Sequence, residues 1–370
     1  MLGRVLIMQW HRLLAQTNEC FVVPESRISL QNAPLARLAL DCLGWRIGAK
    51  SSITHTLTRS WWILLLAWAL NAQAKSTEPP YRDVIEWGRL QGLASRISGD
   101  EIRLTNRWTS LWLKSDSKHL LFGGVEVRLC DPVVTRQGRL RISQRDIEKT
   151  LNPLMEPPQR SSKAIRTLVV NAGHGGKDPG NIEGHRQEKD ATLALASELR
   201  RQLQRSGLRV VMVRGDDQFV ELDDRAAVAN RAGADLYISL HFNETGVSAA
   251  GKAQGVETYC MTPAGAASSN DGDNHGGPRC QGNKQDRLNM VFAHMVHRAI
   301  LDGTDLTDRG VRRARFKELT LLHMPGILVE GGYMNNAHDS QLIFSTAGRT
   351  KLAAAIVDGV LAYKRMLERG

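Results

Sequence analysis

In the second half of the chain, short apolar runs alternate with longer segments in which apolar residues recur every three or four positions. Leu195, Leu199 and Leu203 follow this helical spacing, and Asp190 before them is expected to cap the helix. The same spacing predicts further helices at 223–234, 285–303 and 348–367. The apolar runs bounded by polar residues or glycine predict buried strands at 166–173, 208–214, 234–243, 254–261 and 324–336.

Strands that alternate with helices are typical of a mostly parallel sheet covered by helices on both faces. The sequence therefore predicts an α/β domain over residues 165–370. In open sheets of this kind, ligands bind beyond the carboxyl ends of the strands. We expect the functional residues of this domain to lie at that edge.

A different pattern precedes this domain. Residues 79–156 contain short alternating runs, at 100–115 and 118–131, joined by polar turns, and a short helix is expected after Ser143. This pattern predicts a small α+β domain. The Pro- and Ser-containing stretch 157–164 is predicted to link the two domains.

The beginning of the chain, residues 1–74, has the features of an export leader. Arg59 precedes ten apolar residues, and Ala72-Gln73-Ala74 then supplies a small-x-small cleavage site, so residues 59–74 are predicted to be a signal peptide. The run is too short to span a bilayer, and a buried core helix is the alternative. We expect a misassigned start codon, an exported protein of the periplasm or cell envelope, and no membrane span in the mature chain.

The chain is strongly basic, with a net charge of +11. Removal of residues 1–74 would leave 42 basic and 35 acidic residues, a net charge of +7. This charge indicates an anionic partner: nucleic acid, a membrane surface or an acidic polymer such as the cell wall. The basic residues are scattered and no nucleic-acid-binding motif is present, which disfavours nucleic acid.

Cysteine use gives a weaker indication. The exported chain would keep Cys130, Cys260 and Cys280. An oxidising compartment permits one disulfide, and Cys260 with Cys280 is the expected pair because they bracket a loop rich in Gly, Ser and Asn. No cysteine spacing indicates a metal site.

The loop "NAGHGGKDPGN", 171–181, allows two interpretations. A phosphate-binding loop would follow GxxxxGK[ST] or GxGxxG, and the segment matches neither. Lys177 is not followed by Ser or Thr, and Pro179 removes a backbone donor. The loop is therefore predicted to present His174 to a metal ion.

Four residues could form such a centre at the carboxyl edge of the sheet. His174 and His241 follow two predicted strands, Glu188 begins a helix, and Glu330 ends a third strand. His174, Glu188 or His241 alone is more typical of an ordinary hydrogen-bonded side chain, and His185 is the nearest alternative ligand. Glu330 ends the apolar run "GILVE", so a buried carboxylate there needs a cation or a donor. Together, two His and one Glu match a catalytic zinc site, with a second Glu for general acid/base chemistry.

The ordered motifs resemble those of the zinc-dependent N-acetylmuramoyl-L-alanine amidases, a family of autolysins and cell-division amidases. This resemblance implies that His174, Glu188 and His241 bind Zn²⁺ and that Glu330 is catalytic. Glu183 also lies between His174 and Glu188 and is the alternative glutamate. The motifs are "VVNAGHGGKDPGNIEGHRQEKD", "VRGDDQFVELDDRAAVANRAGADLYISLHFN", "GVETY", "DRGVRRARFKELTLL" and "PGILVEGGYMNN", within residues 166–368.

By this resemblance, the substrate is peptidoglycan and the reaction is hydrolysis of the amide between N-acetylmuramic acid and L-alanine. Asn243 and Arg309 are candidates for substrate contact or for support of the site. The alternatives are a zinc peptidase acting on the stem peptide and a catalytically silent wall-binding protein. Residues 79–156 resemble the N-terminal repeat domain of copper amine oxidases and are expected to help hold the enzyme at the wall. The sequence identifies no protein regulator.

Overall fold

The structure is a computed structural model, and it describes residues 80–158, 164–246, 251–270 and 276–368. The predicted signal peptide and most of the predicted linker lie outside these residues. Contacts divide the chain into residues 1–75 and 76–370, and only the second unit is described here. Within the described ranges, no helix is both long and apolar enough to cross a bilayer.

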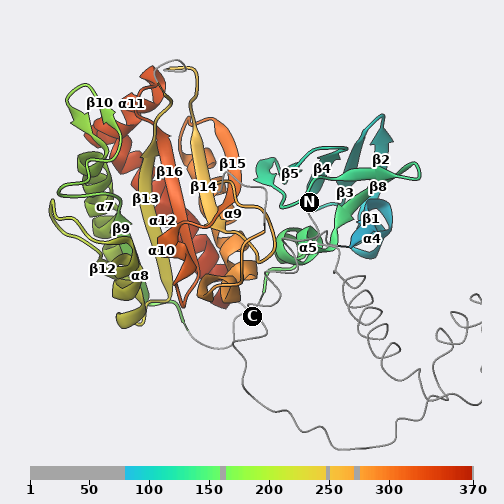
Figure 1. The fold of residues 1–370 in the computed structure, drawn as a ribbon, viewed down its shortest axis with the longest axis horizontal. Coiled ribbons are helices and arrows are strands. Elements are labelled where there is room, and N and C mark those ends of the chain that lie inside the picture. The colour runs from blue at the N-terminus through green and yellow to red at the C-terminus, as the bar shows by residue number, and fades with distance from the viewer. Residues whose placement is uncertain (1–79, 159–163, 247–250, 271–275, 369–370) are drawn as a thin grey trace, which may run out of the picture. The chain divides into compact units, whose positions relative to one another are not determined.

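Residues 164–368 form the predicted α/β layer structure (Figure 1). Its main sheet runs in the order β12-β9-β13-β16-β14-β15, and every neighbouring pair is parallel except β14 with β16. The strands are β9 (Thr167–Ala172), β12 (Arg209–Met212), β13 (Leu236–Asn243), β14 (Val256–Met261), β15 (Asp308–Ala314) and β16 (Gly326–Tyr333). The helices are α7 (Glu188–Arg205), α8 (Leu222–Arg231), α9 (Asp286–Gly303), α10 (Lys317–Thr320), α11 (Ala337–Phe344) and α12 (Thr346–Glu368).

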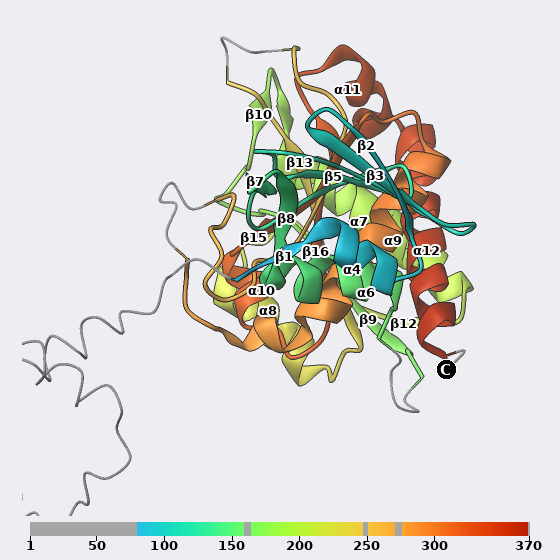
Figure 2. The ribbon, with the colours of Figure 1, turned by 90° about the vertical axis from the view of Figure 1, so that its right-hand side faces the viewer.

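Alternation along the strands builds a separate core on each face of this sheet. Leu168, Ile238 and Val329 pack with apolar residues of α7, α9 and α12. Tyr237 and Leu328, one position away, pack on the opposite face with residues of α8 and α10. Figure 2 shows α9 and α12 on one side of the strands and α8 and α10 on the other. Helices therefore cover both faces, as predicted.

Two features of this region differ from the sequence predictions. Helix α7 begins at Glu188, so Asp190 lies inside the first turn, and the predicted Asp190 cap is wrong. Strand β15 was not predicted, because its "DRGVRRA" sequence lacks an apolar run. Strand β14 runs antiparallel to β16, which agrees with the prediction of a mostly parallel sheet.

Residues 80–158 form short strands and helices, as the α+β prediction required. The helix predicted after Ser143 begins there, and the Ser143 hydroxyl accepts the backbone N–H of Asp146 at 3.0 Å. The strands are β1 (Tyr81–Asp83), β2 (Ala94–Ser98), β3 (Glu101–Thr105), β4 (Ser110–Lys114), β5 (His119–Phe122), β6 (Val125–Arg128), β7 (Val134–Arg136) and β8 (Arg139–Ser143). The helical elements are α4 (Val84–Leu90), α5 (Gln144–Asp146), the π-helical turn η2 (Ile147–Leu151) and α6 (Asn152–Met155).

The two regions form one continuous 11-stranded sheet, in which β6, β5, β4, β3 and β2 follow β15. Val127 of β6 pairs with Val311 of β15, and the backbone N–H of Glu126 donates to Asp308 at 2.8 Å. The division into a lead domain and an amidase domain stays a prediction, since these contacts join the regions within one compact unit.

The expected disulfide is absent from the described residues. Cys130, Cys260 and Cys280 are all free thiols, so the predicted pairing of Cys260 with Cys280 is wrong in this structure. Cys260 is buried in β14, with its sulfur 3.9 Å from Arg313. The Cys280 thiol instead lies 3.2 Å from the side-chain oxygen of Asn283, in the short helical turn η4 (Gln281–Gln285).

Candidate active site

His241 and Glu330 lie next to each other near the carboxyl ends of two central strands. The register pairs His241 of β13 with Glu330 of β16, and directly paired residues point to the same face. Tyr237 and Leu328, an even number of positions earlier on these strands, belong to the core under α8 and α10. The two candidate residues therefore lie on the α8–α10 face, at the edge where ligands of such sheets bind.

His174 follows β9 in a tightly held loop. Its backbone is left-handed, with φ of 60°, a conformation that is uncommon for a residue other than glycine. A bridge between Gly175 and Asp178 closes the loop, and the Asp178 carboxylate lies 2.9 Å from His174 Nδ1. If Nδ1 donates its proton to Asp178, Nε2 is left as the ligand atom.

Two buried arginines fix this loop, and the sequence analysis missed both. Arg214 donates to the backbone carbonyls of Ala172 and Gly173 at 2.9 and 2.8 Å. Arg225 donates to the carbonyl of His174 at 3.1 Å. For Arg225, the indication was a charged residue on the face of α8 that packs against the sheet. Both arginines hold the end of β9, so the position of His174 depends on them.

Glu188, the first residue of α7, completes the group. Its side chain is 2% exposed, and its two oxygens lie 3.0 Å from His174 Nε2 and 3.1 Å from His241 Nδ1. The backbone N–H groups of Phe242 and Asn181 each donate to it at 3.0 Å. Burial alone would raise the pKa of Glu188, but its hydrogen bonds to the two histidines hold this pKa well below the usual range.

The other candidate ligands lie elsewhere. Glu183 and His185 are exposed in the hairpin of β10 (Ile182–Glu183) and β11 (Arg186–Gln187). Glu188 therefore joins the histidines, whereas Glu183 does not.

The spacing of the three ligand atoms fits one small divalent cation. His174 Nε2 and His241 Nδ1 are 3.2 Å apart, and each lies 3.0 or 3.1 Å from Glu188. Tetrahedral zinc with ligands at roughly 2.0–2.1 Å places neighbouring ligand atoms roughly 3.4 Å apart. Burial lowers the pKa of His241, but Glu188 outweighs this effect and the pKa rises to about 9. A bound cation would displace that proton.

Glu330 faces the same space without a partner of its own. Its Oε2 atom is buried and has no hydrogen-bond partner among the described residues. Burial raises the pKa of Glu330 to about 8, against the opposing charge of His241. A carboxyl group that exchanges its proton near neutral pH suits general acid/base catalysis.

Asn243 and Arg309 contact a carboxylate that the sequence analysis did not single out. Glu257 of β14 pairs with Glu330 across the sheet. Asn243 donates to Glu257 at 3.2 Å, Arg309 at 2.8 Å and the Tyr259 hydroxyl at 2.7 Å. Both predicted residues therefore hold Glu257, beside the catalytic candidate Glu330. The sequence indication for Glu257 was a charged residue inside the strand motif "GVETY".

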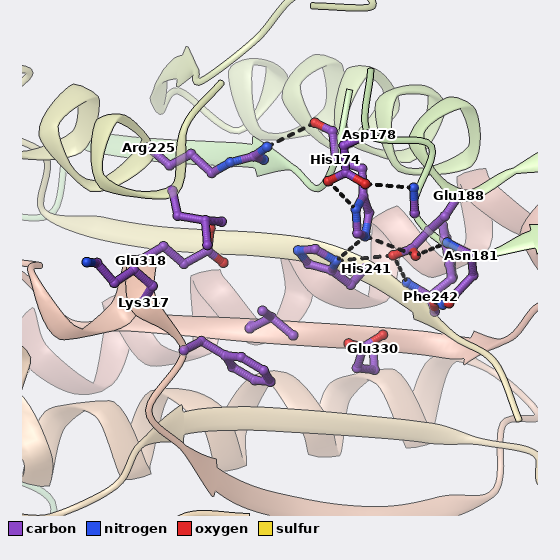
Figure 3. A pocket seen from close by; sticks show the side chains of 14 residues that line it. His174, Asp178, Asn181, Glu188, Arg225, His241, Phe242, Lys317, Glu318 and Glu330 are labelled. Atoms are coloured by element: carbon purple, nitrogen blue, oxygen red, sulfur yellow. Dashed lines mark hydrogen bonds and ion pairs between the residues drawn. The ribbon is translucent and has the colours of Figure 1, made fainter. Parts of the chain in front are cut away.

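One pocket includes the His/Glu/His group and Glu330 (Figure 3). Leu222, Phe316 and Leu328 form an apolar part of its lining, and Glu318 of α10 contributes a further carboxylate. Residues of α8 and α10 thus line the pocket, on the same face of the sheet as His241 and Glu330.

Together, the fold and the site define an α/β protein whose two-histidine, one-carboxylate centre is typical of metal-dependent hydrolases. The family model described as N-acetylmuramoyl-L-alanine amidase matches residues 168–362. The match covers more than half of the chain, and the chain belongs to this family.

Similar proteins agree with the family match. The chain is 28% identical to N-acetylmuramoyl-L-alanine amidase AmiA of Escherichia coli over 247 residues, which cover 60% of this chain and 84% of AmiA. It is 31% identical to the uncharacterized protein YqiI of Bacillus subtilis over 198 residues, 54% of this chain and 84% of YqiI.

Solved amidase structures also resemble the chain. The catalytic domain of CwlV from Bacillus (Paenibacillus) polymyxa var. colistinus is 31% identical, with a TM-score of 0.44, and the match covers 54% of this chain and 97% of that domain. The amidase AmiC2 of Nostoc punctiforme is 30% identical, with a TM-score of 0.46, and the match covers 55% of this chain and 99% of AmiC2.

Proposed function

We propose that this protein is a zinc-dependent amidase that hydrolyses the bond between N-acetylmuramic acid and L-alanine in peptidoglycan. The observation that carries the proposal is the convergence of His174, Glu188 and His241 beside Glu330, in a chain that belongs to this amidase family. Two His and one carboxylate suit zinc and leave a coordination position open.

Different residues of the chain have different roles in the proposed reaction. Bound zinc would polarise the scissile carbonyl and acidify a water. Glu330 takes a proton from the attacking water and donates it to the leaving nitrogen, so that the stem peptide departs with a free amine. Asp178 keeps His174 in the tautomer that presents Nε2. Glu257 stays charged beside Glu330, because burial is outweighed by hydrogen bonds that lower the pKa of Glu257.

The proposed reaction predicts the products of a digest. Purified sacculi treated with the protein should release stem peptides and leave the glycan strands intact, as seen by mass spectrometry. The protein should contain about one zinc per chain, and a chelator should abolish the release. Clipped peptides would instead indicate a stem peptidase, and an unchanged sacculus would indicate a silent wall-binding protein. Active protein without a transition metal would contradict the zinc proposal.

We also propose that the protein is exported and acts in the cell envelope, where peptidoglycan lies. The proposal rests on the leader pattern of residues 59–74 and on the charge of +7 that remains without residues 1–74. N-terminal sequencing of the exported protein is expected to find a mature end near Lys75. A mature end far from Lys75, or no exported protein, would contradict the signal-peptide interpretation.

Residues 79–156 are proposed to help hold the enzyme at the wall. Trp108 is 78% exposed and Arg107 lies over its ring at 4.5 Å, which gives this region an exposed aromatic and cationic surface. Peptidoglycan offers the anionic groups that such a surface attracts.

A further inference from the structure

The two histidines of the site differ in what holds the ring nitrogen that faces away from the other ligands. Asp178 holds that nitrogen of His174, and no described residue holds that of His241. Its Nδ1 faces His174 Nε2 and Glu188 Oε1, so Nδ1 is the atom available to a metal ion. The neutral ring then carries its proton on Nε2. Among the residues that the structure describes, none accepts a hydrogen bond from that Nε2, whereas Asp178 serves His174 Nδ1 at 2.9 Å.

Glu318 presents the complementary feature, a buried acceptor without a donor. Its side chain is 3% exposed on α10. Asn171 Nδ2 donates to Glu318 Oε2 at 3.0 Å, and the Tyr237 hydroxyl donates to the same oxygen at 3.2 Å. The other oxygen, Oε1, is buried and has no hydrogen-bond partner among the described residues. A buried, unsatisfied carboxylate oxygen is costly, so this one requires a donor or an ordered water.

Glu318 and His241 line the same pocket. Tyr237, Ser239 and His241 alternate on one face of β13, and residues two apart on a strand are roughly 7 Å apart. Asn171 donates both to Ser239, at 3.0 Å, and to Glu318, which places Glu318 over this part of the strand. Figure 3 shows Glu318 on the side of the His241 ring that faces away from His174 and Glu188.

We propose that Glu318 is a positioning residue for His241. Its Oε1 accepts the Nε2 proton of His241, directly after a small side-chain rotation or through one ordered water. This contact fixes the tautomer and the orientation in which Nδ1 faces the metal, as Asp178 does for His174. Glu318 therefore acts through His241 and touches neither the substrate nor the metal. The inference rests on the proposed zinc site.

The test compares Glu318→Gln with Tyr237→Phe in the mature chain. Gln has one acceptor oxygen, which cannot serve Asn171 and Tyr237 on one side and the imidazole on the other. Tyr237→Phe removes one donor to Oε2, disturbs the same buried cluster and leaves Oε1 intact. Competition with a chelator of known affinity should show zinc bound about 10- to 100-fold more weakly by Glu318→Gln. Tyr237→Phe should stay within about threefold of the wild type.

A second measurement follows the proton itself. In the zinc-loaded wild type, ¹⁵N-labelled histidine should give a protected Nε2–H signal for His241, and Glu318→Gln should lose it. Unchanged zinc affinity in Glu318→Gln, or an equal loss in Tyr237→Phe, would overturn the proposal, because the effect would then be absent or due to packing. Unchanged affinity with slower turnover would place Glu318 on the substrate instead and would also overturn it.

The same titration separates this proposal from the proposed function. If the wild type binds no zinc, the zinc-dependent function fails, and the role of Glu318 fails with it. If the wild type binds zinc and Glu318→Gln binds it equally well, only the role of Glu318 fails.

Discussion

Glu330→Gln is expected to bind zinc and peptidoglycan like the wild type and to lose turnover by about 10²- to 10⁴-fold. Gln keeps the size of the side chain and cannot take up the proton. Glu330 Oε2 has no hydrogen-bond partner in the described part of the chain, so the substitution breaks no bond there at that atom. Zinc content and rate of stem-peptide release, measured on the same preparation, check this expectation.

The control for this variant is Glu183→Gln, which makes the same chemical change in the exposed β10–β11 hairpin. Glu183→Gln should keep both zinc and turnover. Loss of zinc from Glu330→Gln would show that Glu330 is a ligand, and Glu188 would become the first candidate for the base. Full activity of Glu330→Gln would show that Glu330 takes no part in the proton transfer.

The sequence predicted the position of the site because strand ends can be read from local patterns. His174 and His241 each follow an apolar run, and Glu330 lies toward the end of another. The carboxyl ends of parallel strands meet at one edge, so three separate motifs converge without any knowledge of their contacts. The structure agrees in pairing His241 with Glu330 in register.

Strand β15 could not be predicted in the same way. Arg309, Arg312 and Arg313 interrupt its apolar pattern, and only the structure shows what they contact. Arg309 bonds Glu257, and Arg313 donates to the carbonyl of Met261. A strand whose polar side chains are satisfied by partners about 50 positions away carries no local signal.

The direction of β14 depends on its connection. The sequence predicted a mostly parallel sheet, with no helix between the strands at 234–243 and 254–261. Residues 244–255 join β13 to β14, and their described part contains no helix. A parallel neighbour needs a crossover of a dozen or more residues, usually helical. The described part of this connection lacks such a helix, and β14 runs antiparallel to β16, the strand that pairs in parallel with β13.

The supporting carboxylates were missed because their partners are distant in sequence. Glu318 bonds Asn171, 147 positions away, and Glu257 bonds Arg309, 52 positions away. Their motifs, "FKELT" and "GVETY", show only a Glu among ordinary residues. Local spacing identifies the candidate metal ligands, whereas the groups proposed to orient them become visible only in three dimensions.

Gly173→Ala is expected to weaken metal binding strongly although it substitutes none of the proposed ligands. A Cβ atom at Gly173 would lie 2.3 Å from Cε1 of His241 and 2.6 Å from both of its ring nitrogens. Real Cβ atoms do not approach so closely, so the ring has to move, and Nδ1 leaves His174 Nε2 and Glu188. We expect Gly173→Ala to bind zinc at least about 100-fold more weakly and to lose activity in parallel. This loss of affinity is larger than the usual effect of removing a residue that only hydrogen-bonds to a metal ligand.

Gly215→Ala is the matched control, because a Cβ there meets nothing within 4 Å. It makes the same change in the loop after β12 and should keep zinc, activity and thermal stability. His241→Ala gives the reference for complete loss of this ligand. Overpacking at Gly173 also costs about 1–3 kcal/mol, so circular dichroism and melting temperature are measured on each variant. A folded Gly173→Ala protein with normal zinc content would mean that the His241 ring does not lie against Gly173. The geometry that brings Nδ1 to Glu188 would then be wrong, because the ring reaches Glu188 from its position over this glycine.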